Sequence, residues 1–258
     1  MKKAFLSIFI FLILIIPISC GACTSQQQFP SYTLNSILPR ESFVKIEVSL
    51  IVKDKENPDV GAMNLGKAVA SGAIVRKTNK GSYVLTAEHV CRVEAPPFLV
   101  DPKFSVSGEF KALDIDNNVY NATVYKESNK IDACILFVKS LDGRPALILR
   151  KKAPKIGDKV YNVAAPAGFF GEQMVPIFEG RYSGTYDQHD IYTIPAMGGS
   201  SGSPVVDKDG NLIGMIFAVH RQFPMISFSP SIDDLYDFLA DIKKAPSAPL
   251  EREELTSP

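Results

Sequence analysis

The chain has 258 residues, and its 28 lysine and arginine side chains balance 28 aspartate and glutamate side chains. The lysines and arginines also form no basic stripe along the sequence that could neutralise a phosphate backbone, so nucleic acid is not expected as a partner. Between the terminal segments, from about residue 41 to 244, lie roughly 200 residues, which is enough for one domain built from two small barrels.

The amino-terminal segment has the pattern of an export signal. Two lysines precede an almost unbroken apolar run over residues 4–18, which is shorter than the roughly 18 residues of a membrane span. Cys20 and Cys23 follow, and neither stands in a clean lipoprotein cleavage site, so a lipid anchor, a released chain and an uncleaved signal anchor all stay open. We expect a signal over 1–23, a linker over 24–40, and a protein that is periplasmic, in the cell envelope or secreted, and that meets a membrane only through this end.

Two groups of short strands are predicted next in chain order. Apolar residues alternate with polar ones over residues 44–52, as in a half-buried strand. Further β-rich runs of the first group are 69–75, 83–86, 110–115, 119–125 and 134–138. Those of the second group are 160–164, 175–184, 191–194, 204–206, 212–219 and 225–228. This pattern predicts an all-β fold of two packed antiparallel six-stranded barrels, over about 41–150 and 151–230.

One helix and a tail are predicted at the carboxy-terminal end. Ser231 can cap a helix over 231–243, with Asp234 three residues on. The apolar residues that share one face of this helix are Ile232, Leu235, Phe238, Leu239 and Ile242. Residues 245–258 carry three prolines and three glutamates, and this composition predicts a disordered tail.

Three residue types suited to nucleophilic catalysis occur in separate segments. Ser201 lies in a glycine-rich turn, His89 ends a predicted strand, and Asp132 opens an apolar run. A serine hydroxyl is a weak nucleophile unless a base removes its proton and a third group orients that base. The other two histidines, His189 and His220, lack such a context and are expected to be structural.

The three segments, in the order His, Asp, Ser, resemble the trypsin-like (chymotrypsin-fold) serine proteases. The matching stretches are Thr86-Ala87-Glu88-His89, Asp132-Ala133 before an apolar strand, and Gly199-Ser200-Ser201-Gly202-Ser203-Pro204. The last departs from the family's Gly-x-Ser-Gly-Gly-Pro at Ser203. The resemblance implies that Ser201 is the nucleophile, His89 the base and Asp132 its orienting partner. It also implies an oxyanion hole from the N–H groups of Gly199 and Ser201, an acyl-enzyme intermediate and no cofactor.

Two further segments resemble one branch of this family, and the residues expected around the nucleophile suggest a substrate preference. Residues 156–160 and 165–168 look like the entry to the second barrel in HtrA (DegP-like) proteases and glutamyl endopeptidases, although we expect no PDZ domain after the helix over 231–243. No family-type activation site is present, so activity is either constitutive or gated by loop order. The residues that would line the substrate site are Pro195, Ala196, Ile216, Phe217 and Ala218. With nothing acidic at Pro195 we expect polypeptide substrates with a small or medium apolar P1 residue, while His220 leaves a glutamyl preference open.

Cys91 and Cys134 stand two residues beyond His89 and Asp132. If the two side chains meet, these cysteines are carried into the same neighbourhood, where either a disulfide or two buried free thiols would fit. The four cysteines lack the spacing of zinc ligands, so no metal is expected.

Two other interpretations compete with a serine protease. Gly198-Gly199-Ser200-Ser201-Gly202 also satisfies the Gly-x-Ser-x-Gly nucleophile elbow with Ser200 attacking, but that elbow requires a following helix and a downstream aspartate and histidine. A catalytically inactive binding or scaffold module on the same fold is the second competitor. The presence of all three triad residue types argues against it.

Overall fold

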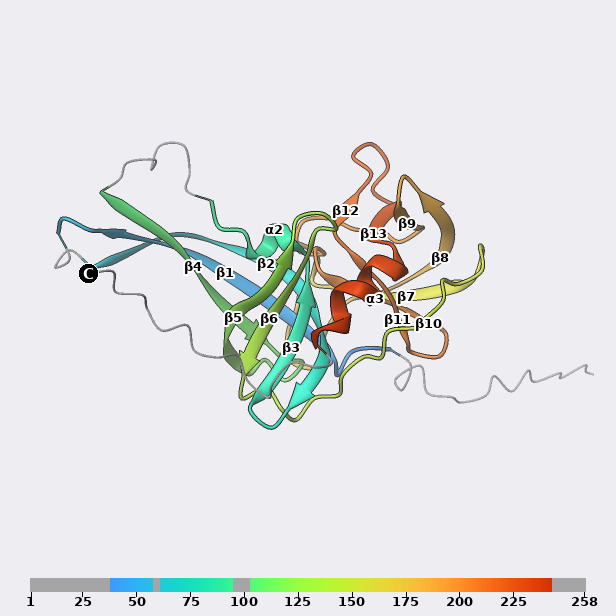
Figure 1. Ribbon diagram of the computed structural model, residues 1–258, viewed down its shortest axis with the longest axis horizontal. Helices are drawn as coiled ribbons and strands as arrows, with labels where there is room; N and C mark the ends of the chain where they lie inside the picture. Colours follow the sequence, from blue (N-terminus) through green and yellow to red (C-terminus); the bar gives the residue numbers. More distant parts are fainter. Residues whose placement is uncertain (1–37, 58–60, 95–102, 243–258) are drawn as a thin grey trace, which may run out of the picture. The chain divides into compact units, whose positions relative to one another are not determined.

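The computed structural model describes residues 38–57, 61–94 and 103–242 (Figure 1). The expected signal, nearly all of the linker and the expected tail lie outside the described residues. No helix within the described part of the chain is long and apolar enough to span a bilayer.

The first barrel is closed and wholly antiparallel, with strand order β1-β2-β3-β6-β5-β4. Its strands are β1 (Phe43–Asp54), β2 (Ala62–Thr78), β3 (Gly81–Thr86), β4 (Phe104–Leu113), β5 (Val119–Ser128) and β6 (Ala133–Lys139). Alternate residues such as Val44, Ile46 and Ile74 point into its buried core, which is why the period-two pattern in the sequence marked these strands.

The second barrel is a seven-stranded antiparallel sheet in the order β11-β10-β7-β8-β9-β13-β12. Its strands are β7 (Lys159–Val163), β8 (Ile177–Tyr186), β9 (His189–Tyr192), β10 (Ser203–Asp207), β11 (Leu212–Ile216), β12 (Ala218–Val219) and β13 (Ser227–Pro230). Six strands were predicted; the seventh arises because the run 212–219 breaks at Phe217. Since β11 and β12 are consecutive in the chain yet form the two ends of the sheet, the sheet curls almost into closure. The prediction of an all-β, two-barrel fold is confirmed.

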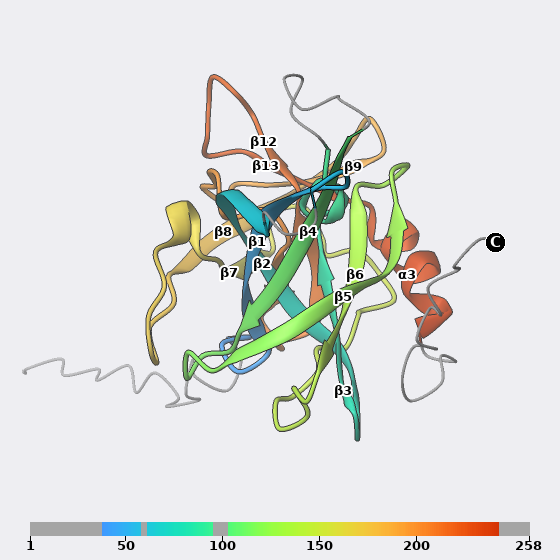
Figure 2. The same ribbon diagram turned by 90° about the vertical axis from the view of Figure 1, so that its left-hand side faces the viewer.

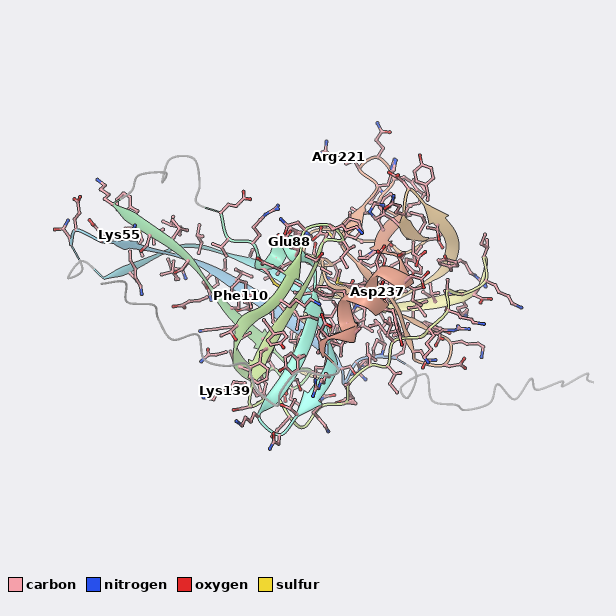
Figure 3. The ribbon with its side chains drawn as sticks, in the orientation of Figure 1. Lys55, Glu88, Phe110, Lys139, Arg221 and Asp237 are labelled. Carbon is pink, nitrogen blue, oxygen red and sulfur yellow. A yellow bond between two sulfur atoms is a disulfide. The ribbon has the colours of Figure 1, made fainter. Side chains whose placement is uncertain are left out.

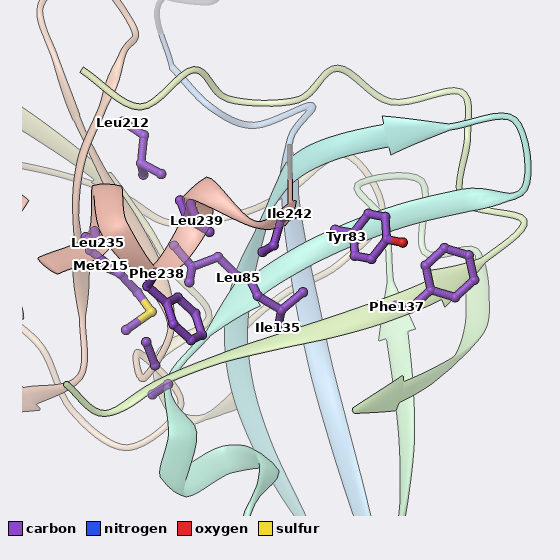
Figure 4. Close-up of a cluster of buried hydrophobic side chains, with 12 residues drawn as sticks. Tyr83, Leu85, Ile135, Phe137, Leu212, Met215, Leu235, Phe238, Leu239 and Ile242 are labelled. Carbon is purple, nitrogen blue, oxygen red and sulfur yellow. The ribbon is translucent and has the colours of Figure 1, made fainter. Parts of the chain in front are cut away.

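Besides the cores of the barrels, an apolar cluster joins the two barrels and the carboxy-terminal helix (Figure 4). It includes Leu85 and Ile135 of barrel one, Met215 of barrel two, and Leu235 and Phe238 of the helix, all buried. The helix is α3 (Ile232–Ala240). Burial of each such side chain stabilises the fold by about 1.5–3 kcal/mol, so this cluster holds together the two halves that must share one site.

Ser231 caps α3 as the sequence predicts, because its side chain accepts a hydrogen bond from the backbone N–H of Asp234. The bond satisfies one of the N–H groups left without a partner in the first helical turn.

Strands β1, β2 and β4 run on together beyond the rest of barrel one (Figures 1 and 2). The β2 strand begins at Ala62 and β4 at Phe104, whereas the sequence predicted strands only from 69 and 110. Ala62 to Ala68 of β2 are all exposed, and without a buried face they carry no alternation by which a strand is recognised.

Candidate active site

Ser201 lies in a tight turn that leads into β10. The turn is closed by hydrogen bonds from the N–H of Ser200 to the carbonyl of Met197 (2.9 Å) and from the N–H of Ser203 to the carbonyl of Ser200 (3.0 Å). Gly202 has a φ of 86°, a region that L side chains rarely adopt. A Cβ added there would lie 2.1 Å from the carbonyl oxygen of Ser71. Only glycine therefore allows the turn to approach β2 this closely.

His89 lies in α2 (Glu88–Cys91), a single helical turn directly after β3. Its Nε2 is 2.9 Å from the Ser201 hydroxyl oxygen, and its Nδ1 is 2.9 Å from Oδ2 of Asp132. The imidazole of His89 thus contacts Ser201 through one ring nitrogen and the carboxylate of Asp132 through the other. With Nδ1 donating to the carboxylate, Nε2 presents its lone pair to the serine hydroxyl.

Asp132 stands immediately before β6 with a φ of 47°, an uncommon conformation for a residue other than glycine. Its Oδ1 also accepts the backbone N–H of His89 at 3.0 Å. Burial raises the pKa of the Asp132 carboxyl, but the hydrogen bonds from the His89 side chain and backbone outweigh it, so the pKa lies below its ordinary value. The carboxylate is therefore ionised at neutral pH and stabilises a protonated imidazole.

Two backbone N–H groups in the turn that carries Ser201 are free to bind a ligand. Those of Gly199 and Ser201 have no hydrogen-bond partner within residues 38–57, 61–94 and 103–242. The N–H of Ala167 donates to the carbonyl of Gly198 at 2.6 Å. Because the peptide between Gly198 and Gly199 is planar and trans, a carbonyl held on that side directs the Gly199 N–H to the other. Such a pair of donors can bind an oxyanion that develops next to the nucleophile.

Ser71 of β2 is hydrogen-bonded to the turn that carries Ser201. Its hydroxyl donates to the carbonyl of Gly199 at 2.8 Å and accepts from the N–H of Ala165 at 3.0 Å. Nothing in the local sequence distinguished Ser71 or Ala167 as site residues, because their contacts come from segments distant in the chain.

Ser200 is unsuited to be the nucleophile. It is buried, with 1% of its surface exposed, and its hydroxyl accepts the N–H of Met197 at 3.3 Å. A strand, β10, follows the motif where a nucleophile elbow requires a helix. These observations exclude the elbow interpretation, in which Ser200 attacks.

A disulfide joins Cys91 at the end of α2 to Cys134 in β6. It ties α2, which carries His89, to β6, which directly follows Asp132. Glu88, the first residue of α2, is labelled in Figure 3 and is buried.

The five residues expected to line the substrate site differ in their burial and contacts. Ala196 is buried, and its N–H donates to the carbonyl of Pro224 at 3.1 Å; Pro195 and Ala218 are half-buried. The Ile216 side chain points into the core of barrel two, and its carbonyl accepts the Gly202 N–H at 2.7 Å.

The Phe217 side chain also turns away, and its ring packs 5.2 Å from that of His189. Asp114, another buried aspartate, accepts hydrogen bonds from Arg144 (3.1 Å for the shorter) and from Asn118. It therefore belongs to a structural ion-pair cluster.

A two-barrel fold with a serine, an imidazole and a carboxylate in hydrogen-bonded sequence defines a serine-type peptidase. The model of the trypsin-like peptidase domain family matches residues 70–215 of the chain, and the chain belongs to that family. The trypsin-like assignment made from the sequence, and with it the enzyme class, is thereby confirmed. No curated protein sequence matches the chain.

Solved structures share the fold at low sequence identity. The Rv3671c protease of M. tuberculosis in its active form aligns with a TM-score of 0.58 and 17% identity, over 82% of this chain and 85% of that one. An inactive form of Rv3671c with a serine-to-alanine substitution aligns with a TM-score of 0.56 and 17% identity, over 82% and 90% of the two chains. At this identity the likeness concerns the fold alone.

Proposed function

We propose that the protein is an exported serine endopeptidase that hydrolyses peptide bonds through Ser201, His89 and Asp132. The observation that carries the proposal is the imidazole of His89, hydrogen-bonded to Ser201 Oγ at 2.9 Å and to Asp132 Oδ2 at 2.9 Å. Both distances lie within the range over which a base takes a proton from a nucleophile and is oriented by its partner.

The reaction follows from these positions. His89 Nε2 takes the proton of the Ser201 hydroxyl as Oγ attacks the scissile carbonyl carbon, and the carbonyl oxygen becomes an oxyanion held by the N–H groups of Gly199 and Ser201. His89 then returns the proton to the leaving amine as the C–N bond breaks. Water, deprotonated by the same imidazole, hydrolyses the resulting ester and frees Ser201. Asp132 stays ionised throughout and stabilises the imidazolium.

The proposed acyl side of the site is formed by Pro195, Ala196 and Ala218, together with the backbone of Ile216 and Phe217. No acidic side chain is among these residues, which supports a small or medium apolar residue at P1. We propose export on the basis of the apolar segment over residues 4–18, and the Cys91–Cys134 disulfide supports it, because such bonds persist in oxidising compartments.

A fluorophosphonate probe tests the nucleophile directly, because it labels only an activated serine. Wild-type protein should be labelled, Ser201→Ala should not, and Ser200→Ala should retain labelling if it folds as the wild type does by circular dichroism. A well-folded wild type that is neither labelled nor active on a fluorogenic peptide library would instead support an inactive binding or scaffold module. The same library, varied at P1, decides between apolar and glutamyl preference.

Export is tested separately by expressing the full chain and fractionating the cells. Incorporation of radiolabelled palmitate that disappears in Cys20→Ala or Cys23→Ala would identify a lipid anchor and its site. Recovery of the full-length chain in the cytoplasm would contradict export without bearing on the triad.

A further inference from the structure

A polar cavity lies where the turn before Asp132 meets the β8–β9 hairpin and the start of α3. Its volume is about 240 Å³, which is below the roughly 300–1,000 Å³ of pockets for drug-sized ligands. The residues that line it include Lys130, Ile131, Asp187, Gln188, His189 and Asp234. No lining residue belongs to the turn of Ser201 or to the segment 216–218, so the cavity is distinct from the candidate active site.

Two walls of this cavity are fixed against each other by a buried carboxylate. Asp190, in β9, accepts the hydroxyl groups of Tyr182 and Thr185, both at 2.9 Å. It also accepts the N–H of Ile232, the first residue of α3, at 3.1 Å. The β8–β9 hairpin is thereby joined to the helix, and a cavity with joined walls requires little ordering when a ligand binds.

The imidazole of His189 is held in a similar way by aromatic rings. Its centroid lies 5.2 Å from that of Phe217 and 6.5 Å from that of Phe228. Neither ring nitrogen has a hydrogen-bond partner among the residues that the structure describes. A neutral imidazole therefore presents one donor or one acceptor to the cavity from a fixed position.

The cavity carries charges of both signs that the rest of the described chain leaves unpaired. The ammonium of Lys130 and the carboxylate of Asp187 are exposed. Within 38–57, 61–94 and 103–242 neither makes an ion pair, and they do not pair with each other across the cavity. Asp234 adds a second carboxylate, of which one oxygen accepts the Ser231 hydroxyl at 2.6 Å.

We propose that this cavity binds a small zwitterion of about the size of a dipeptide. The carboxylate of the ligand pairs with Lys130, and its ammonium pairs with Asp187 and Asp234. At ~30 Å³ for each water molecule the cavity has room for about eight, which suits a ligand of this size. The proposal does not depend on the proposed function, although dipeptides are among the shortest products of peptide-bond hydrolysis.

Ligands that carry a single charge fit the cavity less well. A simple cation would meet the like charge of Lys130, and a simple anion would meet two carboxylates, which weakens binding in each case. A metal ion is disfavoured further, because no three metal-ligating side chains come together among the described residues.

Three probes that differ only at their ends test this charge pattern. ¹⁵N-labelled Ser201→Ala protein is titrated with alanylalanine, with N-acetyl-alanylalanine, which lacks the ammonium, and with alanylalanine amide, which lacks the carboxylate. We expect alanylalanine to give saturable NMR shifts at the amides of Ile131, Gln188 and His189, with a Kd on the order of 1 mM. The other two probes should bind about fivefold more weakly, since each loses one charged pair at an exposed site.

Two variants connect these differences to particular side chains. Lys130→Gln and Asp187→Asn each remove one charge and keep the shape of the side chain, and each should weaken the binding of alanylalanine about fivefold. In Lys130→Gln the zwitterion should lose its advantage over the amide, and in Asp187→Asn its advantage over the acetylated peptide should shrink. Lys80→Gln, at an exposed lysine in the turn between β2 and β3, is the control and should bind all three probes as its parent does.

Three results would overturn the proposal. The first is the absence of saturable shifts well above the expected Kd. The second is equal affinity for alanylalanine and either derivative, which would indicate a site for a simple cation or anion. The third is a set of shifts confined to 198–203 and 216–219, which would place the peptide in the substrate site. Because Ser201→Ala lacks the proposed nucleophile, none of these results depends on whether the protein is a peptidase.

Discussion

Removal of the Cys91–Cys134 disulfide should cost both stability and catalytic efficiency. The two cysteines are 43 residues apart in the chain, and closing a loop of that length restricts the unfolded chain by about 4 kcal/mol at 25 °C. Domains are typically stable by about 5–15 kcal/mol, so Cys91→Ala combined with Cys134→Ala should lose a large part of the free energy of unfolding. The remaining stability should still leave a folded population at low temperature.

The catalytic part of the prediction comes from the attachment of α2. This helix has four residues and no side-chain cap, and its covalent link to β6 lies two residues from both His89 and Asp132. A looser α2 lets the imidazole leave the position between its two partners, and a displacement of about 1 Å can cost as much as a hundredfold in rate. The double variant should therefore react more slowly with a fluorophosphonate even where it is fully folded.

Urea unfolding followed by circular dichroism measures the stability, and labelling kinetics at low temperature measure the site. Val138→Ala, another buried residue of β6 in the same cluster, is the control, because it loses packing without altering any cross-link. The dependence of the unfolding free energy on urea should steepen in the double variant, since its unfolded chain is less compact, and not in the control. A loss below about 1 kcal/mol with an unchanged slope, together with wild-type labelling, would refute the reasoning.

Three further predictions concern single positions. Gly202→Ala places a Cβ 2.1 Å from the carbonyl of Ser71 at a φ of 86°, so it should abolish labelling and lower the thermal midpoint; an active variant of wild-type stability would contradict this. Burial raises the pKa of Asp114, but hydrogen bonds from Asn118 and Arg144 outweigh it and hold the pKa below its ordinary value of 3.8. The resulting stabilisation is present above this ordinary value and is lost as the pH falls below it, through the lower pKa of the folded protein. Unfolding titrations of Asp114→Asn should therefore depend less steeply on pH in this range than those of wild type. Ser231→Ala removes the cap of α3 and should cost about 1 kcal/mol in urea unfolding. Ser231→Thr should stay close to wild type, because a threonine hydroxyl can still accept the N–H of Asp234 and donate to its carboxylate.

The local sequence was sufficient to predict the twelve β-rich runs and the capped helix. Strands with one buried face, such as β8, carry the period of two that such burial imposes, and α3 carries the period of 3.6. Strands buried at almost every position, such as β3 and β6, are instead marked by short apolar runs. The part of β2 before Val69 is exposed on both faces, so its sequence shows no alternation of apolar and polar residues from which a strand could be predicted. The break at Phe217, which divides one predicted run into β11 and β12, depends on closure of the sheet and was not visible either.

The candidate site divides along the same line. Ser201, His89 and Asp132 could be named from the sequence because the short segments around them resemble those of the trypsin-like serine proteases. Their hydrogen-bonded distances, the burial of Ser200, the disulfide rather than two free thiols, and the contact of Ala167 with Gly198 are decided by tertiary structure. Each of these depends on segments tens of residues apart, and the cores of two barrels and the cluster between them bring those segments together; no local pattern encodes that.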